Sequence, residues 1–420
     1  MRPIFDYSSN VKKSFDFSSA ALIEQYDPQG DIFFSSCDCT LLAKPPFANL
    51  LVAGACSIAD QAKQSLRFAK ELGLEAPVVI GAINFDGDKS SYLRISSTAQ
   101  KRKGHEHFET LDESHLKPIH IRTPRLSEQP STAEFGNSVR KALEKFAKGE
   151  LDKVVLSRTL HVDYDTAPNT HQLLKNLAIQ NRHAYTFAID LKHLAQLSGR
   201  DPVHGQATPL NNDVHALVGA SPELLISKHG NQLIAHPLAG SEPRSHVHAI
   251  DQESERRLLA SKKDHYEHAL VIKALREVLT PYCKTLNVPD EPSIVTTSTM
   301  IHLGSLIVGE LHDETTTSLE LALAMHPTPA VCGYPTQNAK AAITELESYP
   351  RKLFTGLVGW CDENGDGEWA VTIRCAEVNN NCITLYAGAG IVTGSCPDKE
   401  TRETGAKFNT MLNAMGPIHR

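Results

Sequence analysis

The chain alternates between short apolar runs and segments with apolar residues at helical spacing. In the first third, the apolar stretches Ile32 to Phe34 and Pro77 to Phe85 predict strands, and the segment from Ile58 to Leu72 predicts a helix. Another helix is expected from Thr132 to Lys148, where Gly149 ends it. This order of elements indicates a mixed α and β fold, and the chain shows no internal repeat.

The same alternation continues to the C-terminus. A strand begins at Lys153, a strand pair spans Leu217 to Ile226, and one long helix is expected from Glu253 to Leu279, stopped by Pro281. The later segments expected to form strands or helices are Met300 to Val308, Ser318 to Met325, Gln337 to Leu346, Leu353 to Trp360, Glu368 to Ala376 and Ile383 to Tyr386.

Three polar stretches interrupt this pattern. Residues from about Ser96 to Thr132 are expected to form a surface excursion, and Asp190 to His215 a loop insertion between two strands. The sequence PLAGSEPR, from Pro237 to Arg244, is expected to be a turn.

The stretch from Leu385 to Leu412 brings several chemical features together. It is expected to run from a short strand through a small-residue loop into a helix that begins after Pro397. Three charged residues of that helix share one face: Glu400, Glu403 and Lys407. A charged stripe beside a glycine loop fits a site for a hard cation and an anionic ligand, although it equally fits a solvated helix face.

Composition excludes several classes of function. Of the 420 residues, 41% are hydrophobic and 22% charged, with a net charge of -7 and no run of Lys or Arg, so nucleic acid is not an expected partner. No apolar segment has the length of a membrane span, and a cytoplasmic location is expected. Nine cysteines without a CxxC pair indicate free thiols.

Three patterns resemble known sites and fail on their spacing. DENGDGE, which begins at Asp362, starts like a calcium loop, but its twelfth position is Ile373, so a hairpin turn is expected. GAG at Gly388 lacks the third glycine of a dinucleotide fingerprint. His265 and His268 lack the HExxH spacing of a zinc site.

Seven motifs, taken in order, resemble those of the chorismate-utilising enzymes. They are KVVLSR from Lys153, GASPELL from Gly219, PLAGSEPR from Pro237, LLASKKDHYEH from Leu258, HPTPAVCGYP from His326, VTIRCAE from Val371, and AGAGIV followed by ETGAK. The resemblance covers Thr132 to Met415 and is strongest to the isochorismate synthases.

This resemblance implies one large α+β fold, in which antiparallel sheets form a sandwich around the site and helices pack outside. Residues 1–420 would then be a single domain, with a less motif-rich part at 1–131 and a catalytic part at 132–420.

The resemblance also implies a set of ligand-binding residues. Glu267 and Glu403 match the family's Mg²⁺ ligands, with Glu400 beside them as a direct or water-mediated acid. The residues that match substrate-binding positions are Gly240, Ser241, His302, Ala330, Arg374, Gly388, Gly390 and Lys407. Arg374 and Lys407 would hold the two substrate carboxylates. His302 equally fits a buried core histidine.

In isochorismate synthases, water adds at C2 of the chorismate ring while the C4 hydroxyl leaves. Lys153 matches the family's general base and Glu223, in SPE, its general acid. Apart from the resemblance, Lys153 also fits a strand-edge residue and Glu223 a turn-capping acid.

Two positions discriminate between branches of the family. Ala239 stands where aminodeoxychorismate synthases carry a lysine, and Lys153 stands where anthranilate synthases typically carry an amide. Isochorismate synthase is therefore expected, with salicylate synthase and a non-catalytic chorismate- or metal-binding paralogue as alternatives. The resemblance favours catechol siderophore biosynthesis, and we expect a monomer with no membrane partner.

Overall fold

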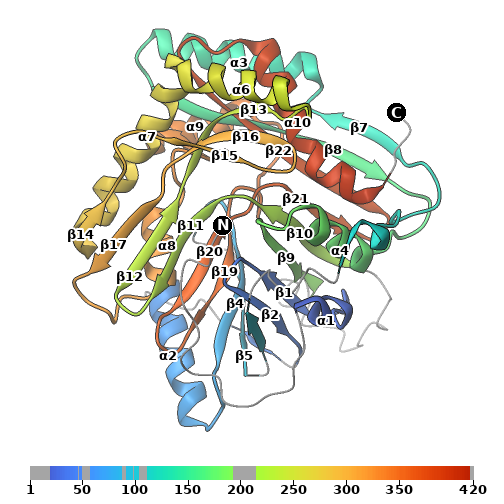
Figure 1. The fold of residues 1–420 in the computed structure, drawn as a ribbon, viewed down its shortest axis with the longest axis vertical. Helices are drawn as coiled ribbons and strands as arrows, with labels where there is room; N and C mark the ends of the chain where they lie inside the picture. The colour runs from blue at the N-terminus through green and yellow to red at the C-terminus, as the bar shows by residue number, and fades with distance from the viewer. Residues whose placement is uncertain are drawn as a thin grey trace, which may run out of the picture.

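The computed structural model describes residues 19–45, 47–49, 57–87, 91–97, 99–103, 111–192 and 214–416. Two large antiparallel sheets and one small sheet form its framework (Figure 1). The first large sheet has the order β18 (Gly333–Tyr334), β8 (Lys153–Asp163), β22 (Cys382–Val392), β21 (Cys375–Asn379), β10 (His215–Ser221), β9 (Tyr185–Asp190), β1 (Ile32–Ser35), β2 (Cys39–Ala43) and β6 (Gln100–Lys103), and β7 (Arg125–Gln129) also pairs with β8.

The second large sheet has the order β14 (Cys283–Asn287), β17 (Ile307–Leu311), β12 (Gln232–His236), β11 (Leu224–His229), β20 (Gly367–Val371), β19 (Leu357–Asp362), β4 (Val78–Ile83), β5 (Tyr92–Ser96) and β3 (Ala48–Asn49). The small sheet contains β13 (Leu238–Pro243), β16 (Met300–Gly304) and β15 (Ser293–Thr296).

The two large sheets face each other across an apolar core. In β1, Ile32 and Phe34 pack into this core, together with Ile80 of β4 and Trp360 of β19, while Phe33 points to the other face of its sheet. Successive strand residues point to opposite faces, and both faces of β1 are buried. The run IFFS is therefore continuously apolar instead of alternating with polar residues.

Helices cover the outer faces of this sandwich. Packed against the first sheet are α1 (Ser19–Glu24), α4 (Thr170–Gln180) and α10 (Pro397–Met415), and against the second α2 (Ile58–Glu71), α7 (Lys262–Leu279) and α8 (Ser318–Met325). The remaining helices are α3 (Thr132–Ala147), α6 (His248–Ala260), α9 (Thr336–Leu346) and the short 3₁₀ turns η2 (Glu113–His115) and η3 (Thr280–Tyr282). The expected fold class, antiparallel sheets in a sandwich with helices outside, is confirmed.

Three sequence-based expectations were wrong. The long helix is two helices, α6 and α7, because the chain bends at Ser261, whose hydroxyl caps α7 by accepting from the backbone N–H of Asp264 at 3.3 Å. PLAGSEPR contains strand β13, not only a turn. Gly388 and Gly390 lie within β22, which pairs with β8 through Val392, and not in a loop.

The polar stretch after Ser96 also contains structure, since β6 and β7 join the edges of the first sheet. Most of the expected insertion between Asp190 and His215 lies outside the described residues. DENGDGE is the predicted hairpin turn, between β19 and β20.

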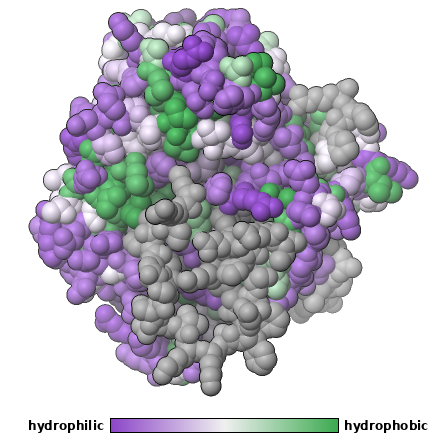
Figure 2. Space-filling model, in the orientation of Figure 1, coloured by the Kyte–Doolittle hydropathy of each residue, from purple (hydrophilic) through white to green (hydrophobic). Residues whose placement is uncertain are grey.

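The surface is ordinary for a globular protein. In Figure 2, hydrophilic residues cover most of the coloured surface on this face, and apolar side chains gather in small patches. No helix within the described ranges combines the length and the apolar character that crossing a bilayer requires.

Candidate functional site

A small cavity lies where the small sheet meets α7, α10 and strand β22. Its volume is about 60 Å³, and it collects residues from sequence positions 155 to 407. Eleven of the predicted site residues line it: Glu223, Gly240, Ser241, Glu267, His302, Ala330, Arg374, Gly388, Gly390, Glu403 and Lys407. The remaining two, Lys153 and Glu400, do not line the cavity but pair with charged side chains beside it.

Each acid of the predicted metal site is paired with its own lysine. Lys153 Nζ lies 3.0 Å from Glu267 Oε1, and Lys263 Nζ lies 2.8 Å from Glu400 Oε1. Lys407 Nζ lies 2.5 Å from Glu403 Oε1. Two helices therefore present three carboxylates whose charges three ammonium groups offset.

The local sequence explains how these groups meet. On α7, Lys263 and Glu267 stand four residues apart, and on α10 the three charged positions recur at i, i+3 and i+7, so each set occupies one helix face. Ser241, on β13, donates a hydrogen bond to Glu403 Oε1 at 2.9 Å and so joins the small sheet to α10.

The two acids of α10 differ electrostatically. Burial, and then the neighbouring Glu403 charge, raise the pKa of Glu400 to about 7. For Glu403, burial acts in the same direction, but the Lys407 ammonium outweighs it and the pKa is lowered. Glu403 is therefore the acid of this pair that keeps its negative charge at neutral pH.

Glu223 is buried at the corner between β10 and β11. Removal from water raises the pKa of its carboxyl to about 7, against the opposing effects of the Leu238 N–H and the positive charges of Lys153 and Arg374. The Leu238 N–H lies at 3.5 Å from Glu223 Oε1. The Glu223 carboxyl is therefore protonated in a large fraction of the protein at pH 7, as a general acid requires.

Arg374 lines the cavity and has a strained backbone conformation. Its φ of +50° falls in the left-handed region that side chains other than glycine rarely adopt. Burial lowers the pKa of Arg374 to about 10, which leaves it charged at neutral pH.

His302 on β16 is directly opposite Ser241 on the adjacent strand β13. Its Nε2 lies 3.4 Å from Arg374 Nη2. Burial and the Arg374 charge hold the pKa of His302 well below its usual range, so the imidazole is neutral.

Gly240 must be glycine on two grounds. Its φ is +82°, and an added Cβ would lie 3.0 Å from Asp264 Cβ on α7. The glycine therefore lets β13 pack closely against α7 at Asp264.

The rejected patterns have other roles. His268 Nε2 lies 2.9 Å from Ser305 Oγ, and His265 pairs with Glu291 at 3.7 Å. In DENGDGE the buried Lys228 ammonium donates to Asp366 Oδ1 at 2.9 Å and to the Asn364 carbonyl at 3.1 Å. Among the described residues, no group of three or more His, Cys, Asp or Glu side chains is arranged as a ready metal cage.

Sequence reasoning missed one charged residue of the site, Lys263. The signal was present, because Lys263 precedes Glu267 by one helical turn and lies within the quoted motif LLASKKDHYEH. What the sequence did not reveal is its partner, Glu400, which is 137 residues away in the chain.

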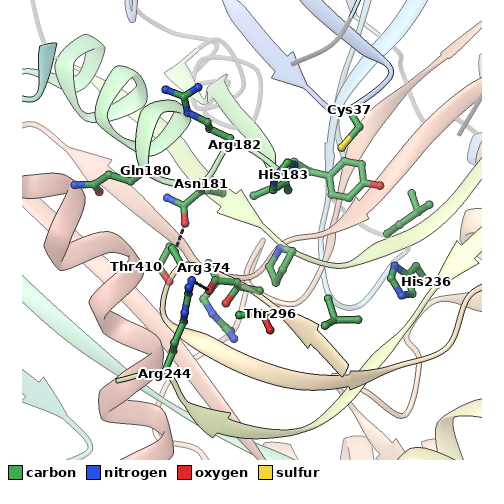
Figure 3. A pocket seen from close by; sticks show the side chains of 18 of the residues that line it. Cys37, Gln180, Asn181, Arg182, His183, His236, Arg244, Thr296, Arg374 and Thr410 are labelled. Carbon is green, nitrogen blue, oxygen red and sulfur yellow. Dashed lines mark hydrogen bonds between the residues drawn. The ribbon is translucent and has the colours of Figure 1, made fainter. Parts of the chain in front are cut away.

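A larger cavity of about 620 Å³ adjoins the small one, and Pro222 and Arg374 belong to the walls of both. Figure 3 shows the side chains that surround it. The basic residues in its described lining are Arg182, His183, His236, Arg244 and Arg374, and that lining contains no Asp or Glu. Burial lowers the pKa of His183 and His236, so the positive charge by which this cavity favours anions comes from its three arginines, of which Arg244 lies 3.6 Å from Asp251 Oδ2.

Comparisons with known proteins agree with this chemistry. Residues 81–413 match the chorismate binding enzyme family. The chain is 42% identical to isochorismate synthase DhbC of Bacillus subtilis over 417 residues, which cover 95% of this chain and 96% of that protein. It is 38% identical to the vibriobactin-specific isochorismate synthase of Vibrio cholerae, covering 88% of this chain and 85% of that one. The crystal structure of DhbC from Bacillus anthracis superposes with a TM-score of 0.83 at 40% identity, covering 95% and 99%.

Proposed function

Because this chain belongs to the chorismate-binding enzymes, we propose that it is a Mg²⁺-dependent isochorismate synthase that serves siderophore biosynthesis. It is an enzyme that converts chorismate to isochorismate. Its relatives over nearly its full length are named as isochorismate synthases. The siderophore assignment rests on the vibriobactin-specific relative. The observation that carries the mechanism is the buried Glu223, whose carboxyl is partly protonated at neutral pH on the wall of the cavity that Arg374 and Lys407 also line.

The acids on α7 and α10 have the right chemistry for Mg²⁺. Carboxylate oxygens are its preferred protein ligands, and it typically takes one or two of them and keeps several waters. Glu267 and Glu403 line the same cavity and would hold the ion, with Glu400 beside them. When bound, the ion supplies positive charge that orients and neutralises a substrate carboxylate.

Lys153 and Glu223 are the proposed base and acid. Lys153 must first release the proton that its ion pair with Glu267 favours; as a neutral amine it then takes a proton from the water that adds at C2, and Glu223 gives its proton to the hydroxyl that leaves C4. Lys153 is fully buried and Glu223 is 3% exposed, so bulk water does not compete for either proton. Burial also explains why Glu223 keeps its proton at neutral pH.

The substrate carries two carboxylates, and two cationic side chains of the cavity, Arg374 and Lys407, could bind them. Arg374 offers a planar, bidentate guanidinium, and Lys407 is fixed by the Gly388 carbonyl, to which its ammonium donates at 2.8 Å. The neutral His302 ring, Ser241 and Gly240 complete the proposed binding surface, with Ala330 and Gly390. The basic lining of the larger cavity would attract the dianion toward Arg374.

Several coarser assignments complete the proposal. We assign residues 1–420 to one chorismate-utilising domain, with a less motif-rich part at 1–131 and the catalytic part at 132–420. We further propose a cytoplasmic monomer with no nucleic-acid or membrane partner. The net charge of -7 and the eight free cysteines among the described residues are compatible with this.

Product analysis tests the proposal directly. Purified protein incubated with chorismate and Mg²⁺ should yield isochorismate by chromatography, and a chelator should stop the conversion. Release of pyruvate would instead identify a salicylate synthase. Absence of turnover in the wild type, or unchanged turnover in Lys153→Ala, would favour a non-catalytic paralogue or another mechanism.

A further inference from the structure

The acidic cluster consists of Glu267, Glu400 and Glu403, each of which forms an ion pair with a lysine. One of these three lysines has no part in the proposed chemistry. Lys153 and Lys407 both act on water or substrate in the mechanism above. Lys263 does neither, although it contributes the same charge to the cluster and pairs with Glu400 at 2.8 Å. Its presence next to a cation site needs a separate explanation, since a fixed ammonium repels an incoming divalent ion.

Lys263 is also the most accessible of the three lysines. Its side chain is 28% exposed, compared with 0% for Lys153 and 12% for Lys407, while its partner Glu400 is only 2% exposed. The ammonium can therefore move toward solvent without unfolding α7, whereas the carboxylate cannot follow it. Lys153 has no such freedom, because it lies within the central part of the fold on β8.

The electrostatic surroundings bind this ammonium to the cluster as a whole. Burial alone would lower the pKa of Lys263, but the charges of Glu400, Glu267 and Glu403 outweigh it and raise the pKa. Lys263 therefore interacts with all three acids and not with Glu400 alone.

We propose that Lys263 is a built-in counterion that neutralises Glu400 in the metal-free enzyme and is released toward solvent when the divalent cation binds. This inference rests on the proposed Mg²⁺ dependence and names the residue that regulates it. Before the ion arrives, the Lys263 ammonium reduces the repulsion between the carboxylates of α7 and α10. The same charge weakens metal binding, because the ion must compete with the ammonium for the carboxylates.

The test measures Mg²⁺ binding rather than turnover. MgCl₂ is titrated into chelator-treated protein by calorimetry, and the melting temperature is followed with and without Mg²⁺. Lys263→Met should bind Mg²⁺ roughly tenfold more tightly than the wild type, because a like charge has been removed. Its melting temperature should fall in the absence of Mg²⁺ and recover most of the loss in its presence.

Two controls separate this role from general effects of charge. Lys262 is exposed on the same helix, and Lys262→Met should leave both the Mg²⁺ affinity and the melting temperature unchanged. Lys263→Arg keeps the charge and should bind Mg²⁺ within about threefold of the wild type. Should Lys263→Met not fold, Lys263→Gln, which still offers Glu400 a hydrogen bond, should also tighten Mg²⁺ binding.

The outcomes distinguish the two proposals. If the Lys263 variants bind Mg²⁺ with unchanged or weaker affinity while the wild type binds it, the counterion role is wrong and the proposed function stands. If neither the wild type nor any variant binds Mg²⁺, with or without chorismate, then the metal dependence itself is wrong, and the inference falls with it.

Discussion

The carboxylate of Glu267 occupies the space that a side chain at residue 390 would need. A Cβ built on Gly390 would lie 1.9 Å from Glu267 Oε1, far inside any possible contact distance. Gly390 is on β22 and Glu267 on α7, so the glycine lets the strand approach the proposed metal ligand. Its role is to make room for the carboxylate that would hold the ion as well as for the ligand.

Substitution of Gly390 should therefore damage metal binding. We expect Gly390→Ala to displace the Glu267 carboxylate, to weaken Mg²⁺ binding at least tenfold and to lower kcat/KM by roughly a hundredfold. Gly388→Ala is the matched control on the same strand, because its added Cβ would come no closer than 3.2 Å to Val155 Cγ1. Calorimetric titration with MgCl₂ compares the two, and equal Mg²⁺ affinities would contradict the assignment of Glu267.

The protonated Glu223 should set one limb of the pH–rate profile. Since burial raises its pKa to about 7, the acid form predominates below pH 7 and is lost above it, so kcat should decline as pH rises through this region. Glu223→Gln should reduce kcat by roughly a thousandfold and remove that limb, while chorismate binding changes little. Steady-state kinetics from pH 6 to 9 measures both, and a wild-type profile that is flat across pH 7 would exclude Glu223 as the acid.

The same carboxyl should cost the protein stability at high pH. Its pKa is raised in the folded state, from 4.5 to about 7, so the folded protein keeps a proton that the unfolded chain releases near pH 4.5. The cost of ionising Glu223 therefore grows between these values and is complete above pH 7.

The uncharged Gln variant avoids this cost. Glu223→Gln should be about 2–3 kcal/mol more stable than the wild type at pH 8, with little difference at pH 4.5. Urea unfolding at the two pH values tests this, and a variant that is less stable at pH 8 would show that the carboxylate is well compensated after all.

The basic lining of the larger cavity should speed association with the substrate. Arg244 is one of its cations; its Nη1 donates to the Thr297 carbonyl at 2.8 Å, and its Nε lies 3.6 Å from Asp251 Oδ2, which offsets part of its charge. Arg244→Gln should lower kcat/KM several-fold at low salt and flatten its dependence on ionic strength, with kcat unchanged.

Two variants control for this effect. Arg256→Gln removes an exposed charge from α6 and should behave as the wild type, and Arg244→Lys should restore the salt dependence. Identical salt slopes for Arg244→Gln and the wild type would exclude steering by this residue.

The Lys228 ammonium should be a determinant of folding stability and not of catalysis. It is 2% exposed and pairs with Asp366 inside the β19–β20 hairpin. Lys228→Met removes the lysine partner of Asp366, which keeps the Gly230 N–H at 2.9 Å and His229 Nδ1 at 3.0 Å, and should cost roughly 2 kcal/mol in urea unfolding, with kcat unchanged. Lys284→Met removes a lysine from the exposed pair with Glu310 and should cost less than about 1 kcal/mol. Equal losses for the two variants would contradict the structural role of Lys228.

Local sequence sufficed for elements whose ends carry their own signals. The helix at Thr132 begins at a Ser131–Glu134 capping box and ends at Ala147, two residues before Gly149, so its limits were predicted closely. The helix break at Ser261 was missed because apolar spacing continues across it, although Ser261 is itself an N-cap signal for α7, and both helices pack against the same strands, β13 and β16. Gly388 and Gly390 looked like a loop because strand propensity disfavours glycine, yet pairing with β8 holds them in β22.

By itself, the pattern of the sequence indicated a mixed α and β fold, and its motifs, through the family resemblance, implied the antiparallel sandwich and eleven of the residues that line the cavity, because motifs and hydrophobic periodicity are local properties of the chain. Only the tertiary structure decided which charges meet. Lys153 and Glu267 are 114 residues apart and Lys263 and Glu400 are 137 apart, yet both pairs lie within ion-pair distance. Burial, which raises the pKa of Glu223, likewise depends on strands from distant parts of the chain, so no local pattern could have revealed it.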